Sequence, residues 1–173
     1  MLESSPCNVS QFLDIADPQT VPRAFVTGIR SEFARQHTCD LVRGPLLLKY
    51  GGVHMDVGIM QVGNLDRLWN ETIADPQSPW VVLAFNMGGI DGQSCILSSY
   101  FIASAKNNAF FERSHRLLLA LWAGRTSTKG MHDGPLLKDL PLIGSAADLS
   151  FGNQEETMLQ RERAETATDY MIH

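Results

Sequence analysis

The double glycine at positions 51 and 52 restricts the fold of this chain more than any other feature of its sequence. Residues 38–50, before it, read as a helix, and a glycine is the usual residue just past a helix end. Residues 53–57, after it, are a short apolar run that predicts a strand. Pro45 lacks the backbone donor that a helix interior needs, so we expect the helix to kink or split there. The segment therefore predicts a helix, a tight turn and a strand.

The rest of the chain predicts alternating helices and strands. Thr38 is the predicted N-cap of helix 38–50, and Pro22 lies in a predicted first turn. The alternation predicts an α/β layer architecture in a single domain over 1–173, with its core at 21–140 and a surface helix or tail at 153–173. Further helices are predicted at 21–36, 64–73, 108–124 and 135–140, a buried strand at 79–85 and another strand at 95–105.

Composition excludes several classes of function. The 14 basic and 19 acidic residues give a formal charge of −5, which argues against a nucleic-acid or anionic-membrane surface. No apolar run approaches the roughly 18 residues of a membrane span, and residues 1–12 have neither the basic nor the apolar region of a secretory signal. Three cysteines without paired spacing predict free thiols in a reducing compartment, and hence a cytoplasmic location.

Three charged residues around the double glycine are candidates for a binding site. Asp40 and Arg43 are three residues apart, so they share one face of the predicted helix, a spacing that is also typical of a solvated ion pair. Asp56 lies at or just past the carboxyl end of the predicted strand, where ligands bind in open α/β sheets. A carboxylate there suits a hard divalent cation, although capping a turn is the commoner role.

These residues together carry a family resemblance. The run D-L-V-R-x-x-L-L-x-K-Y-G-G-V-x-M-D-V, within residues 39–58, resembles the S-D-x-x-R … L-Y-x-Y-G-G-x-Y-x-D-x-D signature of retaining glycosyltransferases of the capsular-polysaccharide-synthesis and glycosyltransferase-32 type. A weaker resemblance extends the match to about residues 21–140. It implies a reduced GT-A-like fold, with a small mixed sheet flanked by helices. It also implies a nucleotide-sugar donor whose hexose is transferred, with retention, to an unknown acceptor.

The resemblance implies a role for each matching charged residue. Asp40 corresponds to the acid that contacts the donor sugar, and Arg43 to the base that contacts the sugar or a phosphate. Asp56 corresponds to the first acid of the metal-binding D-x-D, which implies Mn²⁺ or Mg²⁺. Gly58 stands where the second acid is usual, so we expect weaker metal binding than a site with two acids gives.

Other residues of the matched segments are also candidates. Tyr50 and Gly52 belong to the same motif and are predicted to bind substrate. His132 and Asp133 lie in an H-D-G-P segment that loosely resembles an active-site T-G-P segment of the family. His132 is therefore a candidate acid or base, or an exposed loop histidine, and Asp133 a candidate substrate contact. His54 replaces an aromatic residue of the motif and is interpreted as structural.

Three functional hypotheses follow. The strands that open the nucleotide pocket of the GT-A fold have no counterpart ahead of the motif, so we expect either a fragment of a transferase or a reused scaffold. The first hypothesis is the metal-assisted hexosyltransferase. The second is a metal-independent cyclase or isomerase of natural-product biosynthesis, with an apolar pocket of residues such as Met55, Trp80 and Phe85, and His132 or Asp56 as acid or base. The third is a non-catalytic pseudoenzyme or interaction module.

The small number of predicted strands also predicts self-association. A thin sheet leaves an unpaired edge, and an exposed edge is a template for pairing with another chain. Closed two-fold symmetry is the commonest way to cover such an edge. We therefore expect a homodimer, unless the polar segment 153–173 folds back over the exposed face.

Overall fold

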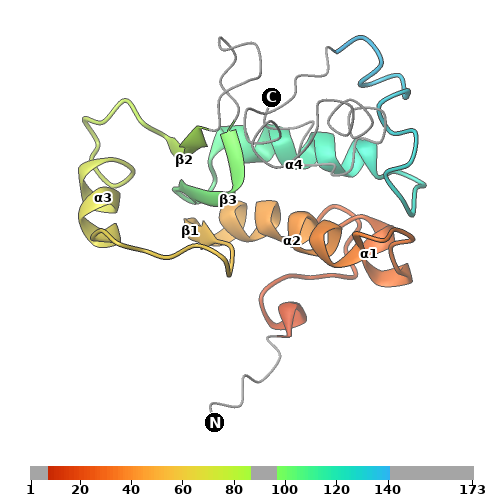
Figure 1. The fold of residues 1–173 in the computed structure, drawn as a ribbon, viewed down its shortest axis with the longest axis horizontal. Coiled ribbons are helices and arrows are strands. Elements are labelled where there is room, and N and C mark those ends of the chain that lie inside the picture. Colours follow the sequence, from red (N-terminus) through yellow and green to blue (C-terminus); the bar gives the residue numbers. More distant parts are fainter. Residues whose placement is uncertain (1–7, 87–96, 141–173) are drawn as a thin grey trace, which may run out of the picture.

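A computed structural model describes residues 8–86 and 97–140 of the chain. A single turn of 3-10 helix, η1 (Val9–Gln11), and a short helix, α1 (Arg23–Thr27), precede the longest helix, α2 (Ala34–Tyr50). The strand β1 (Gly52–Met55), the helix α3 (Leu65–Glu71), the strands β2 (Val82–Asn86) and β3 (Leu97–Ser104), and the helix α4 (Ala109–Leu121) follow. Figure 1 shows α2 and α4 side by side, the sheet at one end of them and α3 beyond the sheet. The α/β class is confirmed.

The sheet has the order β1-β3-β2, and both of its ladders are antiparallel. The prediction of a mixed sheet is therefore wrong for the described residues. β1 and β2 do run in the same direction, but β3 lies between them, so no parallel ladder forms. The pairing of Gly52 with Ser104 and of Met55 with Phe101 sets the register of β1. As a result, the end of β1 lies beside the middle of β3 rather than beside the end of another strand.

The first two predicted helices differ in extent from their observed counterparts. The predicted helix 21–36 ends at Thr27, because Gly28 leaves the helix with a φ of 97°. The next helix begins at Ala34, so Thr38 is an interior residue whose hydroxyl donates to the Ala34 carbonyl, and its prediction as N-cap is wrong. Pro45 lies within one continuous helix rather than at a break between two. The predicted end at Gly51 is confirmed.

The apolar core lies between α2 and α4 and continues onto the sheet. One cluster surrounds Leu41 of α2 and Leu118 of α4, and includes the buried Trp122 and Met131. A second cluster joins Leu47 of α2 to the sheet and α4 through Ile102 and Phe111. One face of α2 is therefore fixed against two elements, which orients the charged residues on its neighbouring face.

The run 79–85 is not the buried strand that its apolar composition predicts. The strand begins at Val82, and the side chains of Trp80, Val81 and Phe85 are all exposed. The reason is its place in the sheet, since β2 is an edge strand within the described residues. Residues 135–140, predicted to start a helix, form hydrogen-bonded turns instead. The predicted helix or tail at 153–173 lies outside the described residues.

Helix α4 has the start that its sequence indicates. Asn108 is its N-cap, and the side chain accepts a hydrogen bond from the Phe110 backbone N–H. No helix in the described part of the chain is long and apolar enough to cross a membrane.

Candidate functional site

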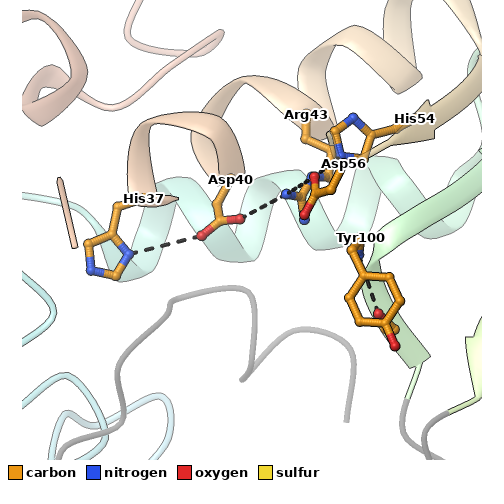
Figure 2. Close-up of polar contacts among 7 residues, drawn as sticks. His37, Asp40, Arg43, His54, Asp56 and Tyr100 are labelled. Atoms are coloured by element: carbon orange, nitrogen blue, oxygen red, sulfur yellow. Dashed lines mark hydrogen bonds and ion pairs between the residues drawn. The ribbon is translucent and has the colours of Figure 1, made fainter. Parts of the chain in front are cut away.

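Five titratable side chains form a row that runs along α2 to the end of β1. They come from His37, Asp40 and Arg43 on the helix and from His54 and Asp56 at the strand (Figure 2). On α2, the spacing of three residues places the first three on one face. On the strand, the spacing of two residues does the same for the other pair. The turn at Gly51 brings the two faces together.

The pair of Asp40 and Arg43 is buried. The guanidinium Nη2 lies 3.2 Å from Asp40 Oδ1, and both side chains are more than nine-tenths buried. The solvated ion pair that sequence alone favours is therefore not what forms. A buried ion pair is costly to desolvate, and it is retained only with good geometry and further partners.

Arg43 also reaches Asp56, 13 residues further along the chain. Its Nη2 lies 3.5 Å from Asp56 Oδ1. Asp56 follows β1 directly, and its backbone N–H donates to the Tyr100 carbonyl at 2.9 Å, so β3 fixes its position. The structure thus brings together all three charged residues that the motif singles out.

Asp56 differs from Asp40 in its exposure to solvent. Its side chain is 45% exposed, against 8% for Asp40. Both Arg43 and His54 approach the same oxygen, Oδ1, and the other oxygen has no hydrogen bond or ion pair among the described residues. Asp56 therefore presents a carboxylate that a ligand from solvent can reach, anchored from behind by a buried arginine.

His54 is the closest partner of Asp56. Its Nε2 lies 2.9 Å from Asp56 Oδ1, and its side chain is 26% exposed. Burial, and then the nearby Arg43 guanidinium, lower the pKa of His54 below its ordinary value, although the hydrogen bond and charge of Asp56 act to raise it. The imidazole is thus mostly neutral at pH 7.

His37 closes the other end of the row. It is 1% exposed, its ring meets Trp122 edge-on at 5.9 Å between centroids, and its Nδ1 lies 4.0 Å from Asp40 Oδ2. This distance is too long for a direct hydrogen bond. His37 thus lies between the apolar core and the ion pair.

Tyr50 and Gly52 lie close to the row in sequence but have other neighbours. The Tyr50 hydroxyl donates to the Phe12 carbonyl at 2.9 Å, as does the Lys49 ammonium at 2.7 Å, so both hold the N-terminal segment. Gly52 opens β1 opposite Ser104 with a φ of 98°. Their predicted contacts with substrate stay predictions.

His132 and Asp133 form a separate pair. His132 Nε2 lies 3.2 Å from Asp133 Oδ1, and neither has a hydrogen bond or ion pair with Asp40, Arg43 or Asp56 in the part of the chain that the structure describes. The neighbouring Met131 is buried in the cluster around Leu41. The loop is therefore anchored to the core, and the predicted catalytic role of His132 stays a prediction.

The donor set suits a divalent cation only in part. Among the described residues, no group of three or more histidine, cysteine, aspartate or glutamate side chains could hold a metal ion. The pair of Asp56 and His54 remains, with one carboxylate open to solvent. Mg²⁺ and related ions often take only one or two protein ligands and complete their coordination with substrate phosphates and water. Asp56 thus fits an ion that a phosphate-bearing substrate would share.

Comparison with known proteins places the chain in a family. A family model described as capsular polysaccharide synthesis protein matches residues 6–129, a range that contains the whole row from His37 to Asp56. The chain belongs to the capsular polysaccharide synthesis protein family. No solved structure matches the chain.

Curated members of similar sequence are fungal proteins named as glycosyltransferases. The "Probable glycosyltransferase FCK3" of Fusarium pseudograminearum is 38% identical over 79% of this chain and 34% of its own length. "Glycosyltransferase afumC" of Aspergillus fumigatus is 35% identical over 82% of the chain and 36% of its own length. "O-glycosyltransferase braB" of Annulohypoxylon truncatum is 33% identical over 82% of this chain and 33% of its own length. The chain thus spans about a third of the length of the curated relatives it matches.

Sequence reasoning missed two members of this row of side chains. His37 supports no site by its sequence position alone, and His54 is easily taken as structural. Spacing was the available signal, since His37 precedes Asp40 by three helical residues and His54 precedes Asp56 by two strand residues. A search for titratable residues at these spacings from the motif acids would have found both.

Proposed function

We propose that this chain carries the donor-binding part of a glycosyltransferase that uses a nucleotide sugar. The observation that carries the proposal is the row of Asp40, Arg43 and Asp56, in which a buried arginine joins two acids from different elements. Family membership and relatives named as glycosyltransferases support it. The proposal includes a GT-A-like arrangement and transfer of a hexose with retention.

Each residue of the row has a proposed part in donor binding. Asp40 accepts from hydroxyl groups of the donor sugar. Arg43 has two buried nitrogens, Nε and Nη1, without a hydrogen bond among the described residues, which are donors for a sugar or phosphate oxygen. The arginine would stabilise the charge that develops on the departing diphosphate. Asp56 would hold a divalent cation, Mn²⁺ or Mg²⁺, that supplies further neutralisation of that charge.

The proposed acceptor is a hydroxyl group. Two relatives, the proteins braB and PaGT, are named as O-glycosyltransferases. Several apolar side chains close to the site in sequence are exposed, among them Val57, Met60 and Val62 in the segment after Asp56. An acceptor with apolar surface would fit this segment.

Removal of the Asp56 carboxylate is the direct test. We expect the wild-type chain to bind a UDP-hexose with Mn²⁺ and to hydrolyse it slowly, and Asp56→Ala to reduce hydrolysis by roughly 100-fold. Calorimetry measures binding, and release of UDP measures hydrolysis. Asp66→Ala removes an exposed acid in the first turn of α3 and should leave both unchanged. Absence of binding by the wild-type chain at millimolar UDP-hexose would exclude the proposal.

The other hypotheses predict different outcomes of the same experiment. A metal-independent cyclase or isomerase keeps its activity in EDTA, whereas the proposed transferase loses it. A pseudoenzyme keeps its biological role when Asp40, Arg43 and Asp56 are replaced together. Within residues 8–86 and 97–140, the site offers two adjacent candidate ligands, Asp56 and His54, and not three, so the metal-independent hypothesis is worth testing.

We also propose that the chain forms a homodimer through its sheet. β1 and β2 are the outer strands of the described sheet, and Trp80 and Phe85 are 59% and 47% exposed beside the β2 edge. Pairing along this edge would cover both the unpaired backbone and the aromatic side chains. Sedimentation equilibrium at micromolar concentration should give twice 19.1 kDa. Trp80→Lys should shift the equilibrium toward monomer, and a wild-type monomer would exclude the dimer.

A further inference from the structure

We propose that His54 is a direct metal ligand, so that His54 and Asp56 form a nitrogen-and-oxygen site that favours a first-row transition-metal ion over Mg²⁺. This inference rests on the proposed function, because it names a second protein ligand for the cation of the same site. It also accounts for how a site with Gly58 in place of a second acid can bind a cation.

The distance between the two side chains matches a shared ion. His54 Nε2 and Asp56 Oδ1 are 2.9 Å apart. Two ligand atoms at right angles around an ion, each about 2.1 Å from it, lie about 3.0 Å apart. The imidazole nitrogen and the carboxylate could therefore ligate one ion with only a small adjustment. A hydrogen bond holds the same two atoms together when no ion is bound.

The backbone keeps this pair in register. His54 lies opposite Ile102 in the ladder of β1 with β3, and the Asp56 N–H continues the ladder to the Tyr100 carbonyl. Residues two apart on a strand point to the same face. Both side chains are partly exposed, so an ion can reach them from solvent.

The charges around the pair also permit a cation. Arg43 brings one positive charge to within 3.5 Å of Asp56, but Asp40 lies 3.2 Å from the same guanidinium nitrogen. Among these three side chains, two carboxylates and one guanidinium sum to a net negative charge. The buried pair of Asp40 and Arg43 thus offsets the repulsion that Arg43 alone would exert on an ion at Asp56.

The chemical nature of the two ligands decides the preferred metal. Mg²⁺ takes oxygen ligands almost exclusively. Imidazole nitrogen suits later divalent ions, whose affinity for a given site rises from Mn²⁺ through Fe²⁺ to Co²⁺ and Ni²⁺. A site whose second ligand is the His54 imidazole rather than an acid should therefore have a lower affinity for Mg²⁺ relative to Co²⁺ and Mn²⁺.

The test measures metal binding directly, apart from activity. The full chain is titrated with Co²⁺, Mn²⁺ and Mg²⁺ by calorimetry, with and without UDP, for the wild type, His54→Phe and His54→Gln. We expect His54→Phe to weaken Co²⁺ binding by about tenfold or more and to leave Mg²⁺ binding within a factor of two. Bound Mn²⁺ should show nitrogen coupling in its electron spin-echo modulation, and His54→Phe should remove it. Glu71→Gln is the control, because it removes an exposed carboxylate from the Arg67–Glu71 pair on α3 and should leave Co²⁺ affinity unchanged.

The outcomes separate this inference from the proposed function. Unchanged Co²⁺ affinity in both His54 variants, with a loss in Asp56→Asn, would overturn the role of His54 and leave the transferase proposal intact. Absence of metal binding by the wild type would also overturn it, while UDP binding without metal would still support donor binding. Circular dichroism confirms that the variants are folded, and His54→Gln supplies a second folded variant that keeps polarity.

Discussion

Arg43→Met is expected to lower the free energy of unfolding by about 3 kcal/mol or more, because breaking a buried ion pair by removing one partner is strongly destabilising. The Arg43 side chain is 5% exposed and lies within ion-pair distance of Asp40, which is 8% exposed, and of Asp56. Methionine keeps most of the apolar stem, so the loss reports the charge rather than a cavity. Urea denaturation followed by circular dichroism measures the change.

Arg67→Met is the matched control for this experiment. Arg67 pairs with Glu71 at 2.7 Å on α3, but both side chains are mostly exposed, at 73% and 60%. Exposed ion pairs are screened by solvent and contribute little to stability, so we expect no measurable change in the free energy of unfolding. If both variants lose the same free energy of unfolding, then burial does not make the Arg43 ion pair more important for stability than an exposed pair.

Gly51→Ala is expected to be the most damaging single methyl addition in the described part of the chain. Gly51 has a φ of 67°, and a Cβ there would lie 2.5 Å from the Lys106 backbone nitrogen and 2.9 Å from the Ser104 carbonyl oxygen. The left-handed conformation costs a non-glycine residue about 1–2 kcal/mol, and the backbone clash adds to it. We expect a total loss of about 3 kcal/mol or more in the free energy of unfolding, measured by urea denaturation.

Two other glycines separate the contributions at Gly51. Gly124 has a similar φ of 71° and open space around its Cβ position, so Gly124→Ala measures the conformational cost alone. Gly58 has neither a positive φ nor a close neighbour, so Gly58→Ala should be nearly neutral. If Gly51→Ala lowers the free energy of unfolding no more than Gly124→Ala does, then the close approach of the turn to the segment after β3 does not constrain it.

The turn at Gly51 links stability to the candidate site. It places the end of α2 against the start of β1, and so brings Asp56 to Arg43. A glycine is needed there because two backbone segments meet without room for a side chain. Damage at Gly51 should therefore weaken metal and donor binding as well as folding.

Local sequence patterns predict most of the helices and strands of this protein. The helix that ends before Gly51, the strand that follows it, and the helices predicted at 64–73 and 108–124 all correspond to elements of the structure. These features depend on helical spacing, capping side chains and glycine conformation, which act within a few residues of each other. The motif residues Asp40, Arg43 and Asp56 were identified from their spacing and from the family resemblance of residues 39–58.

How those elements combine depends on contacts between segments that are distant in the sequence. The antiparallel order of the sheet, the exposed edge at β2 and the burial of Asp40 with Arg43 depend on which segments meet across the chain. The partners of Asp56 come from α2, from two residues earlier on the strand and, through its backbone, from β3. His37 and His54 lie in the row because α2 packs on α4 and β1 pairs with β3. Local patterns specify each face, but burial and pairing between distant segments decide what that face meets.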